Sequence, residues 1–252
     1  MKHIIVAGAN QGIGYYMVKQ LLAQGLQVTA LDLETDNLAA LSPEPGALLP
    51  LICDVSDPEQ VNRCVKESVT RFNQVDCAVQ NACLCTFGPM ESTPNSTYRA
   101  VFDVNYFGAL NLARAVLPYM KGQKSGRVIF TSSGVGVTGF DGISPYASTK
   151  GAIESLAKCL NIEYAGYGIS FHIFHPPLTN TKSAGDLPVP KEFMATPEKV
   201  GNGLAKNIIK KSFVICHSFS QKAQTALCYL FPIKMGKMMS MMTSRYARQQ
   251  EK

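Results

Sequence analysis

Short apolar runs alternate along this chain with longer segments of helical periodicity. The run His3–Ala7 is rich in β-branched residues, the amphipathic segment Tyr15–Gln24 follows it, and a second apolar run occupies Gln27–Leu31. The alternation continues without a linker or an internal repeat, which predicts an α/β protein with a single domain, residues 1–252. We expect a doubly wound, seven-stranded parallel sheet with helices on both faces. The other predicted strands are Leu48–Cys53, Val75–Val79, Arg127–Thr131, Ile169–His175 and Ser212–Cys216.

Proline and capping residues mark where several of the predicted helices begin. Pro58 follows Asp57, and Thr196 stands directly before Pro197, as expected for an N-cap and a first helical turn. In a doubly wound sheet, ligands bind beyond the carboxyl ends of the strands, so we expect the functional site there. The later predicted helices are 57–72, 97–121, 144–165 and one that starts at Thr196.

A glycine-rich turn lies between the first predicted strand and the first predicted helix. Its glycines let a backbone come close to a ligand, and the helix N-terminus offers free N–H groups and the positive end of a dipole. A tight turn without a ligand is the alternative, but the strand before it and the helix after it favour a phosphate site. The residues predicted to contact the phosphates are Gly8, Asn10, Gln11, Gly12, Ile13 and Gly14.

Asp32 ends the second predicted strand, eighteen residues beyond Gly14. A carboxylate at this place can accept hydrogen bonds from the adenosine ribose hydroxyls of a dinucleotide. It would also repel a 2′-phosphate, and no Arg or Lys follows within several residues to offset it. The pattern therefore favours NAD(H) over NADP(H); the alternative is that Asp32 only caps the next turn.

Tyr146 and Lys150 stand four residues apart, directly after Pro145. If Pro145 opens a helix, the phenol and the ammonium share one helix face. A nearby positive charge lowers the pKa of a phenol, and such a pair can exchange a proton with an alcohol or a ketone. The spacing alone is also compatible with a solvated helix face, so its meaning depends on the other motifs.

Taken in order, these motifs resemble those of the short-chain dehydrogenases/reductases, and the resemblance covers nearly the whole chain. It implies a Rossmann-type fold and an NAD(P)(H)-dependent oxidoreductase that interconverts a secondary alcohol and a ketone. It also implies a catalytic set in which Ser133 positions the substrate oxygen and Tyr146 transfers a proton. Lys150 would lower the pKa of Tyr146 and hold the nicotinamide ribose, and Asn105 would hold a water that relays protons. The further cofactor contacts that the resemblance implies are Asp54, Val55, Asn81, Ala82, Tyr146, Lys150, Pro176 and Thr181.

Three positions depart from the family pattern. Ala7 replaces the usual Thr that braces the glycine-rich turn, Cys83 replaces a Gly beside the cofactor, and Pro177 replaces a Gly in the closing loop. Pro177 fixes its φ angle and lacks an N–H, so we expect a stiffer loop with one backbone donor fewer. These changes keep a second hypothesis open, in which the chain is a catalytically weak dinucleotide-binding regulator or scaffold.

Composition adds constraints on compartment and ligands. The length of 252 residues suits one α/β domain, and the chain opens on a strand rather than on a leader segment. Eight cysteines at irregular spacings are typical of small apolar core residues in a reducing compartment rather than of a disulfide framework. Cys83 and Cys85 lack the partners of a metal site. We therefore predict a cytoplasmic protein with a small-molecule substrate, no metal and no nucleic-acid partner.

The C-terminal region combines positive charge with apolar residues. Residues 205–252 contain nine Lys or Arg and one acid, Glu251, and we treat 220–252 as a basic, apolar C-terminal extension. Lys234 and Lys237 interrupt it, so it falls short of the ~20 apolar residues of a membrane span. It can lie as an amphipathic helix on an anionic membrane, or pack on its own domain or on a second subunit as a lid. Each arrangement suits a hydrophobic substrate.

Two segments of the chain resemble more specific features of the family. The loop Pro176–Thr181 and the apolar C-terminal segment resemble the 3-ketosphinganine reductase branch, whose members generally prefer NADPH, a preference that Asp32 argues against. Residues 182–211, which include Gly185, Pro188 and Pro190, stand where the family has its substrate loop and the helix after it. Family membership further implies a homodimer or homotetramer assembled through the helices of Asn105 and Tyr146.

Overall fold

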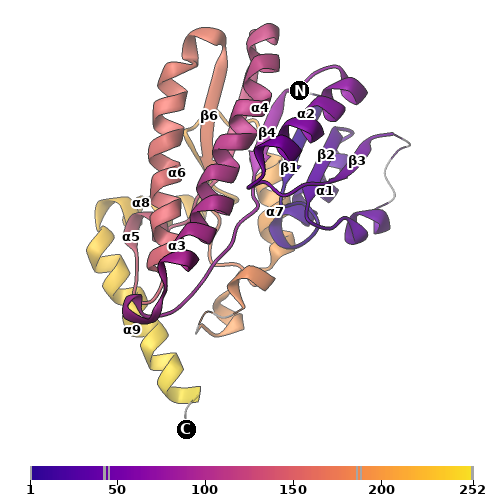
Figure 1. Cartoon of the computed structure of the whole chain (residues 1–252). Helices are drawn as coiled ribbons and strands as arrows, with labels where there is room; N and C mark the ends of the chain where they lie inside the picture. Colours follow the sequence, from indigo (N-terminus) through magenta and orange to yellow (C-terminus); the bar gives the residue numbers. More distant parts are fainter. Residues whose placement is uncertain (1, 42–43, 45, 186, 188, 251–252) are drawn as a thin grey trace.

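The computed structural model describes residues 2–41, 44, 46–185, 187 and 189–250, and within them the strands form one parallel sheet (Figure 1). Met1, Pro188, Glu251 and Lys252 lie outside the described residues. The seven-stranded prediction is confirmed, with strand ends that differ by at most two residues. The strands are β1 His3–Ala7, β2 Gln27–Asp32, β3 Leu48–Ile52, β4 Cys77–Gln80, β5 Gly126–Thr131, β6 Ile169–Phe174 and β7 Val214–Ile215.

The order of the strands places the site. The sheet runs β3-β2-β1-β4-β5-β6-β7, so the chain reverses its direction of winding between β1 and β4. Ala7 at the end of β1 pairs in register with Leu31 of β2 and with Gln80 of β4. The carboxyl ends of these strands are therefore level, and the loops that leave them diverge, which opens a crevice at this point.

Helices cover the sheet in two layers (Figure 1). On one face, α1 (Gly12–Ala23) and α7 (Pro197–Asn207) bury residues such as Met17 and Leu204 against β1 and β2. On the other face, α2 (Pro58–Phe72) packs on β2 and on α4 (Gly108–Gln123), while α4 and α6 (Ser144–Glu163) pack on β4, β5 and β6. Strands buried on both faces explain the continuous apolar runs of the sequence. Short 3₁₀ turns occupy Asp36–Ala40, Met90–Ser92, Ala165–Tyr167, Lys182–Ala184 and Lys191–Phe193.

The long helix predicted over 97–121 is wrong as a single regular helix. The structure has α3 (Asn95–Phe102), a π-helical turn (Asp103–Phe107) and α4 in succession. The side-chain amide of Asn105 is buried and makes three hydrogen bonds, to the backbone of Leu84 and to the hydroxyl of Thr149. These bonds stabilise the wider turn, a local change of helix type that often accompanies functional sites.

Two helices that the strand pattern did not predict form the C-terminal segment, and Figure 1 shows them projecting beyond the sheet. The first, α8 (Phe219–Leu230), starts at the N-cap Ser218, and α9 (Pro232–Gln250) follows after a single residue. Both pack on the short helix α5 (Val135–Thr138) and on each other. Among the described residues, no helix has the length and apolar character needed to cross a membrane.

The contact between α9 and α5 predicts the effect of one glycine substitution. A Cβ at Gly236 would come 2.7 Å from the carbonyl oxygen of Thr138, and that oxygen belongs to backbone that cannot move freely. Gly236→Ala should therefore displace α9, lower the free energy of unfolding by about 1–3 kcal/mol and expose the C-terminal segment to trypsin.

Gly122→Ala in α4 is the matched control. A Cβ there meets no atom within 4 Å, so the helix should gain about 0.5–1 kcal/mol of stability. Equal unfolding free energies and equal trypsin cleavage rates for Gly236→Ala and the unmodified protein would contradict the observed packing of α9.

Candidate active site

A cavity of ≈ 580 Å³ lies at the carboxyl ends of the strands and extends to α9. Its wall contains most of the residues that the sequence predicted for the site. Asn10, Gly14, Asn105 and Lys150 are not part of this wall and lie behind it. The predicted residues in the wall are Gly8, Gln11, Gly12, Ile13, Asp32, Asp54, Val55, Asn81, Ala82, Ser133, Tyr146, Pro176 and Thr181.

The glycine-rich turn is held by close backbone contacts. Gly8 has a φ angle of 75°, and a Cβ there would overlap the backbone nitrogen of Ala82. A Cβ at Gly14 would overlap the carbonyl oxygen of Gly8, to which the side chain of Asn81 donates a 3.1 Å hydrogen bond. Gln11 precedes α1 without capping it, and the first turn of α1 contains no acid. Its N–H groups are therefore available to an anion in the cavity.

Asp32 both braces the turn and lines the cavity. Its carboxylate accepts hydrogen bonds from the backbone N–H groups of Asn10 (2.7 Å) and Leu33 (2.8 Å), which leaves further lone pairs for a ligand. The hydrogen bond from the N–H of Leu33 agrees with the alternative in which Asp32 caps the next turn. Asp32 also lines the cavity wall, a position that capping alone does not require. Asn10 itself is 5% exposed, and its side chain accepts from the N–H of Asn37. Asn10 therefore supports the turn, and its contact with a cofactor stays a prediction.

Tyr146 and Ser133 meet at the cavity wall, as the sequence predicted. The hydroxyl of Ser133 forms a hydrogen bond with the phenol of Tyr146. Burial raises the pKa of this phenol well above its ordinary value, Cys83 and Cys85 raise it further, and the bond to Ser133 offsets only part of the shift. The phenol is therefore protonated at neutral pH.

Lys150 is a buried cation that is held at the end of β5. Its ammonium donates a 2.8 Å hydrogen bond to the carbonyl oxygen of Thr131 and lies 5.3 Å from the centre of the Tyr146 ring. The side chain is 1% exposed, and burial lowers its pKa. The net pKa of Tyr146 is raised, because desolvation of the phenol outweighs the other contributions. The lowering of this pKa by Lys150 stays a prediction.

The loop after β6 brings a predicted cofactor contact, Thr181, and a residue of the predicted substrate loop, Lys182, to the glycine-rich turn and the cavity wall. Thr181 lies against the glycine-rich turn, since a Cβ at Gly12 would come 3.2 Å from its methyl carbon. The next residue, Lys182, supplies a cation to the cavity wall beside the helix N-terminus. Its position directly after a predicted contact was the signal that could have found it.

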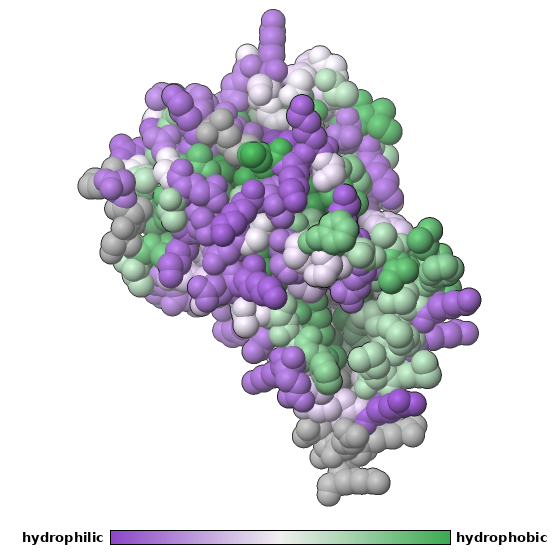
Figure 2. Space-filling view, turned by 180° about the vertical axis from the view of Figure 1, so that it is seen from behind, coloured by the Kyte–Doolittle hydropathy of each residue, from purple (hydrophilic) through white to green (hydrophobic). Residues whose placement is uncertain are grey.

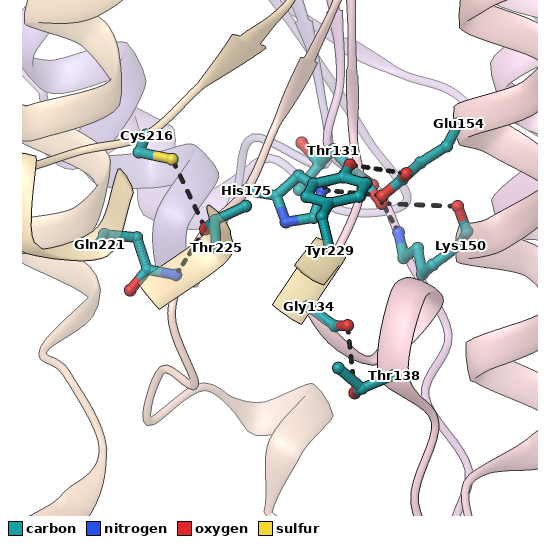
Figure 3. Close-up of polar contacts among 11 residues, drawn as sticks. Thr131, Gly134, Thr138, Lys150, Glu154, His175, Cys216, Gln221, Thr225 and Tyr229 are labelled. Carbon is teal, nitrogen blue, oxygen red and sulfur yellow. Dashed lines mark hydrogen bonds and ion pairs between the residues drawn. The ribbon is translucent and has the colours of Figure 1, made fainter. Parts of the chain in front are cut away.

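Behind the wall, a carboxylate connects four elements (Figure 3). Glu154 lies one turn beyond Lys150 on α6 and is 4% exposed. One of its oxygens accepts from Ser132 (2.7 Å) and lies 2.7 Å from Nε2 of His175, and the other accepts from the hydroxyl of Tyr229 (2.7 Å). Glu154 thereby ties α6 to the ends of β5 and β6 and to α8. A Glu four residues after Lys150 was the available sequence signal.

The cysteines follow the sequence prediction only in part. Cys53, Cys64, Cys77, Cys216 and Cys228 are buried core residues, as predicted. The prediction is wrong for Cys159, which is exposed, and for Cys83 and Cys85, which are half-buried in the cavity wall. Within the described part of the chain, no group of three or more His, Cys, Asp or Glu side chains is arranged to hold a metal ion.

Comparison with known proteins identifies the family. Residues 2–190 match the family model described as short chain dehydrogenase. The chain belongs to the short-chain dehydrogenase family. A solved short-chain dehydrogenase from Streptomyces avermitilis has the same fold, with a TM-score of 0.77 and 26% identity over 89% of this chain and 91% of that one.

Two curated relatives of this short-chain dehydrogenase are similar in sequence. L-fucose dehydrogenase of Bos taurus is 33% identical over 180 residues, which cover 69% of this chain and 65% of the relative. This chain therefore spans just under two thirds of that protein. 3-ketodihydrosphingosine reductase of Bos taurus is 28% identical over 230 residues, which cover 84% of this chain and 69% of the relative. The second match confirms the resemblance to the 3-ketosphinganine reductase branch.

The family binds NAD or NADP, and the donor set of this cavity fits such a dinucleotide. The uncapped N–H groups of α1 and the Lys182 ammonium suit a pyrophosphate, and Asp32 suits a ribose. The backbone at Gly8 and Gly14 approaches its neighbours more closely than any side chain would allow. Asp54, Val55 and Ala82, which the resemblance assigned to the cofactor, also line the wall.

The carboxylate network predicts a pH-dependent loss of stability. Burial raises the pKa of Glu154, but the contacts with His175, Ser132 and Tyr229 outweigh it and hold the pKa below its ordinary value of 4.5. A carboxylate with a depressed native pKa stabilises the fold above its unfolded pKa and loses this contribution as the pH falls through the native pKa. Glu154→Gln should lower the free energy of unfolding at pH 7 by about 2–3 kcal/mol.

The deficit should shrink as the pH falls below about 4.5, where protonation removes the charge from the unmodified protein as well. Denaturant unfolding over a pH series measures both effects, and Glu163→Gln at the exposed end of the same helix is the control, with no change expected. A deficit that is independent of pH would contradict the charged network.

Proposed function

We propose that this chain is an oxidoreductase that interconverts a secondary alcohol and a ketone with a nicotinamide dinucleotide. The observation that carries the proposal is one continuous cavity that contains the glycine-rich turn at one end and the Ser133–Tyr146 pair in its wall. A dinucleotide held at the turn and a carbonyl held at the pair would share this cavity. A bound nicotinamide supplies or accepts the hydride.

The side chains of the cavity supply position and a proton. Ser133 holds the substrate oxygen beside the phenol, and Tyr146 donates its proton to that oxygen as the ketone is reduced. The raised pKa of Tyr146 supports this role, because a protonated phenol is the acid that reduction requires. In the oxidative direction the same phenol, once deprotonated, takes the proton back from the alcohol.

Lys150 and Asn105 act from behind the wall. Lys150 is anchored on Thr131, close enough to Tyr146 to hold a cofactor ribose between them. The amide of Asn105 is occupied by Leu84 and Thr149, so it fixes the loop after β4 against α6. We propose in addition that a water held near Asn105 relays protons during the reaction.

The substrate that we propose is hydrophobic. The part of the cavity beyond Tyr146 is formed by aromatic and aliphatic side chains and by methionines, which adapt to irregular apolar ligands. The polar side chains that the C-terminal helices contribute come from both α8 and α9, and they are Gln221, Gln224, Thr225 and Thr243. The apolar residues are Phe140, Ile143, Leu187, Val189, Phe193, Met235, Met238, Met239 and Met242.

Assembly, location and the alternative function complete the proposal. We infer a homodimer or homotetramer formed through the helices that carry Asn105 and Tyr146, where Phe107 and Ile162 are exposed. We place the protein in the cytoplasm, in contact with a membrane surface. The alternative, a catalytically weak dinucleotide-binding scaffold, is supported by Ala7, Cys83 and Pro177, but Ser133 and Tyr146 meet as an active enzyme requires.

Replacement of the phenol tests the reaction. Tyr146→Phe should lower kcat by about 10²–10⁴, because the proton donor is lost while the shape of the cavity is kept. Dissociation constants for the cofactor should change less than about threefold, since no phosphate or adenosine contact is removed. The control is Tyr119→Phe in α4, outside the cavity wall. Full activity of Tyr146→Phe with hydrophobic ketones would rule out the proposed role.

A pair of titrations tests the cofactor preference, which we propose to be NAD(H) over NADP(H). Asp32 would repel the 2′-phosphate, so NADH should bind at least about tenfold more tightly than NADPH. The fluorescence of NADH and NADPH can be followed directly, because the reduced nicotinamide absorbs at longer wavelengths than the protein side chains do. Asp32→Ser should narrow the difference, and tighter binding of NADPH by the unmodified protein would overturn the assignment.

A further inference from the structure

The helices α8 and α9 expose an apolar surface that no described residue covers. Leu230 is 69% exposed, Ile233 66% and Met241 56%, and Phe219 at the start of α8 is 86% exposed. Figure 2 shows apolar atoms gathered over the C-terminal helices, with hydrophilic atoms projecting at the outer margin. An apolar surface of this extent, on helices that project from the body of the domain, indicates an interaction site.

The charge on this surface has one sign. Lys222, Lys234, Lys237 and Arg245 are exposed on α8 and α9, and the sequence of these two helices contains no Asp or Glu. Asp141 lies beside them, and its backbone N–H donates to Ser240. The carboxylate of Glu154, which accepts from Tyr229 of α8, is buried and does not face this surface. The surface therefore complements an anionic partner. Two copies of it face to face would bring like charges together, which is unfavourable.

The mouth of the cavity opens beside this surface. Met238 and Met242 of α9 line the cavity and are 42% and 54% exposed. On the other side Phe193, from the loop after β6, lines the cavity and is 67% exposed. Figure 2 shows a hollow with apolar walls next to the C-terminal helices. An apolar molecule could therefore pass from an apolar phase into the cavity without crossing water.

We propose that α8 and α9 dock on an anionic lipid bilayer and place the cavity mouth against it, so that the substrate enters from the membrane. The apolar side chains enter the headgroup boundary and the cations contact lipid phosphates, as in helices that lie in a membrane interface. The docking of α8 and α9 on the membrane is argued from the exposed surface alone. The entry of substrate from the membrane depends in addition on the proposed reductase function.

The first test measures vesicle binding without activity. The full chain should co-sediment with vesicles of equal parts phosphatidylcholine and phosphatidylglycerol, and at least about tenfold less with phosphatidylcholine alone. Lys234→Glu with Lys237→Glu should weaken binding about twentyfold or more, because each cation near an anionic surface contributes about a fivefold factor. Leu230→Ser with Ile233→Ser should also weaken binding.

Matched control variants come from the opposite end of the sheet. Ile209, Lys210 and Lys211 are exposed beside the start of β5, where Arg127 donates to the carbonyl oxygens of Ile208 and Lys210. Ile209→Ser, and Lys210→Glu with Lys211→Glu, should leave vesicle binding unchanged. If these controls weakened vesicle binding as much as the variants in α8 and α9 do, the loss would reflect net charge or average hydropathy. That outcome would overturn the proposed docking surface.

The second test separates docking from chemistry. Leu230→Ser with Ile233→Ser should keep the kcat for a water-soluble ketone and lose at least tenfold in kcat/KM for a long-chain ketone dissolved in the vesicles. An inactive unmodified protein that still binds vesicles would overturn the reductase and leave the docking intact. No vesicle binding, with a dimer that Leu230→Ser and Ile233→Ser convert to monomers, would assign the surface to a second copy and overturn the proposal.

Discussion

One face of α6 is bound to the carboxyl ends of β5 and β6 by two buried charged side chains, and the site depends on this attachment. Lys150 donates to the carbonyl oxygen of Thr131, and one turn later Glu154 accepts from Ser132 and pairs with His175. Charges at 1% and 4% exposure are tolerated only because these partners replace water. Since Tyr146 precedes Lys150 by one helical turn, the same attachment sets the phenol against Ser133 at the cavity wall.

The same buried carboxylate, Glu154, also binds α8, which forms part of the cavity wall on the proposed substrate side. The hydroxyl of Tyr229 donates to the second oxygen of Glu154, so α8 is bound to the scaffold of the reacting groups. Apart from this bond, α8 and α9 pack mainly on α5 and on each other. A segment with few buried contacts is the least costly part of a fold to displace. The wall formed by the C-terminal helices can therefore adapt to a bulky apolar ligand while the catalytic face of α6 stays in place.

Local physics explains what could be predicted. Apolar runs bounded by turn residues specify strands buried on both faces, so the seven strands and their parallel arrangement follow from the pattern. A glycine-rich turn between a strand and a helix, and a Tyr four residues before a Lys, bring their groups together through local geometry alone. The π-helical turn at Asn105 could not be predicted in this way, because the partners that stabilise it, Leu84 and Thr149, are distant in sequence.

The sequence by itself determined the fold and the family and predicted the reacting groups, because these depend on periodicity and on short spacings. Only the tertiary structure decided the state and surroundings of those groups. It showed that burial dominates the pKa of Tyr146, since desolvation depends on every element packed around the phenol. It also decided that Asn10 supports the turn, that Lys182 joins the wall and that the basic C-terminal helices flank the cavity mouth. These are relations between segments far apart in the chain, which no local pattern encodes.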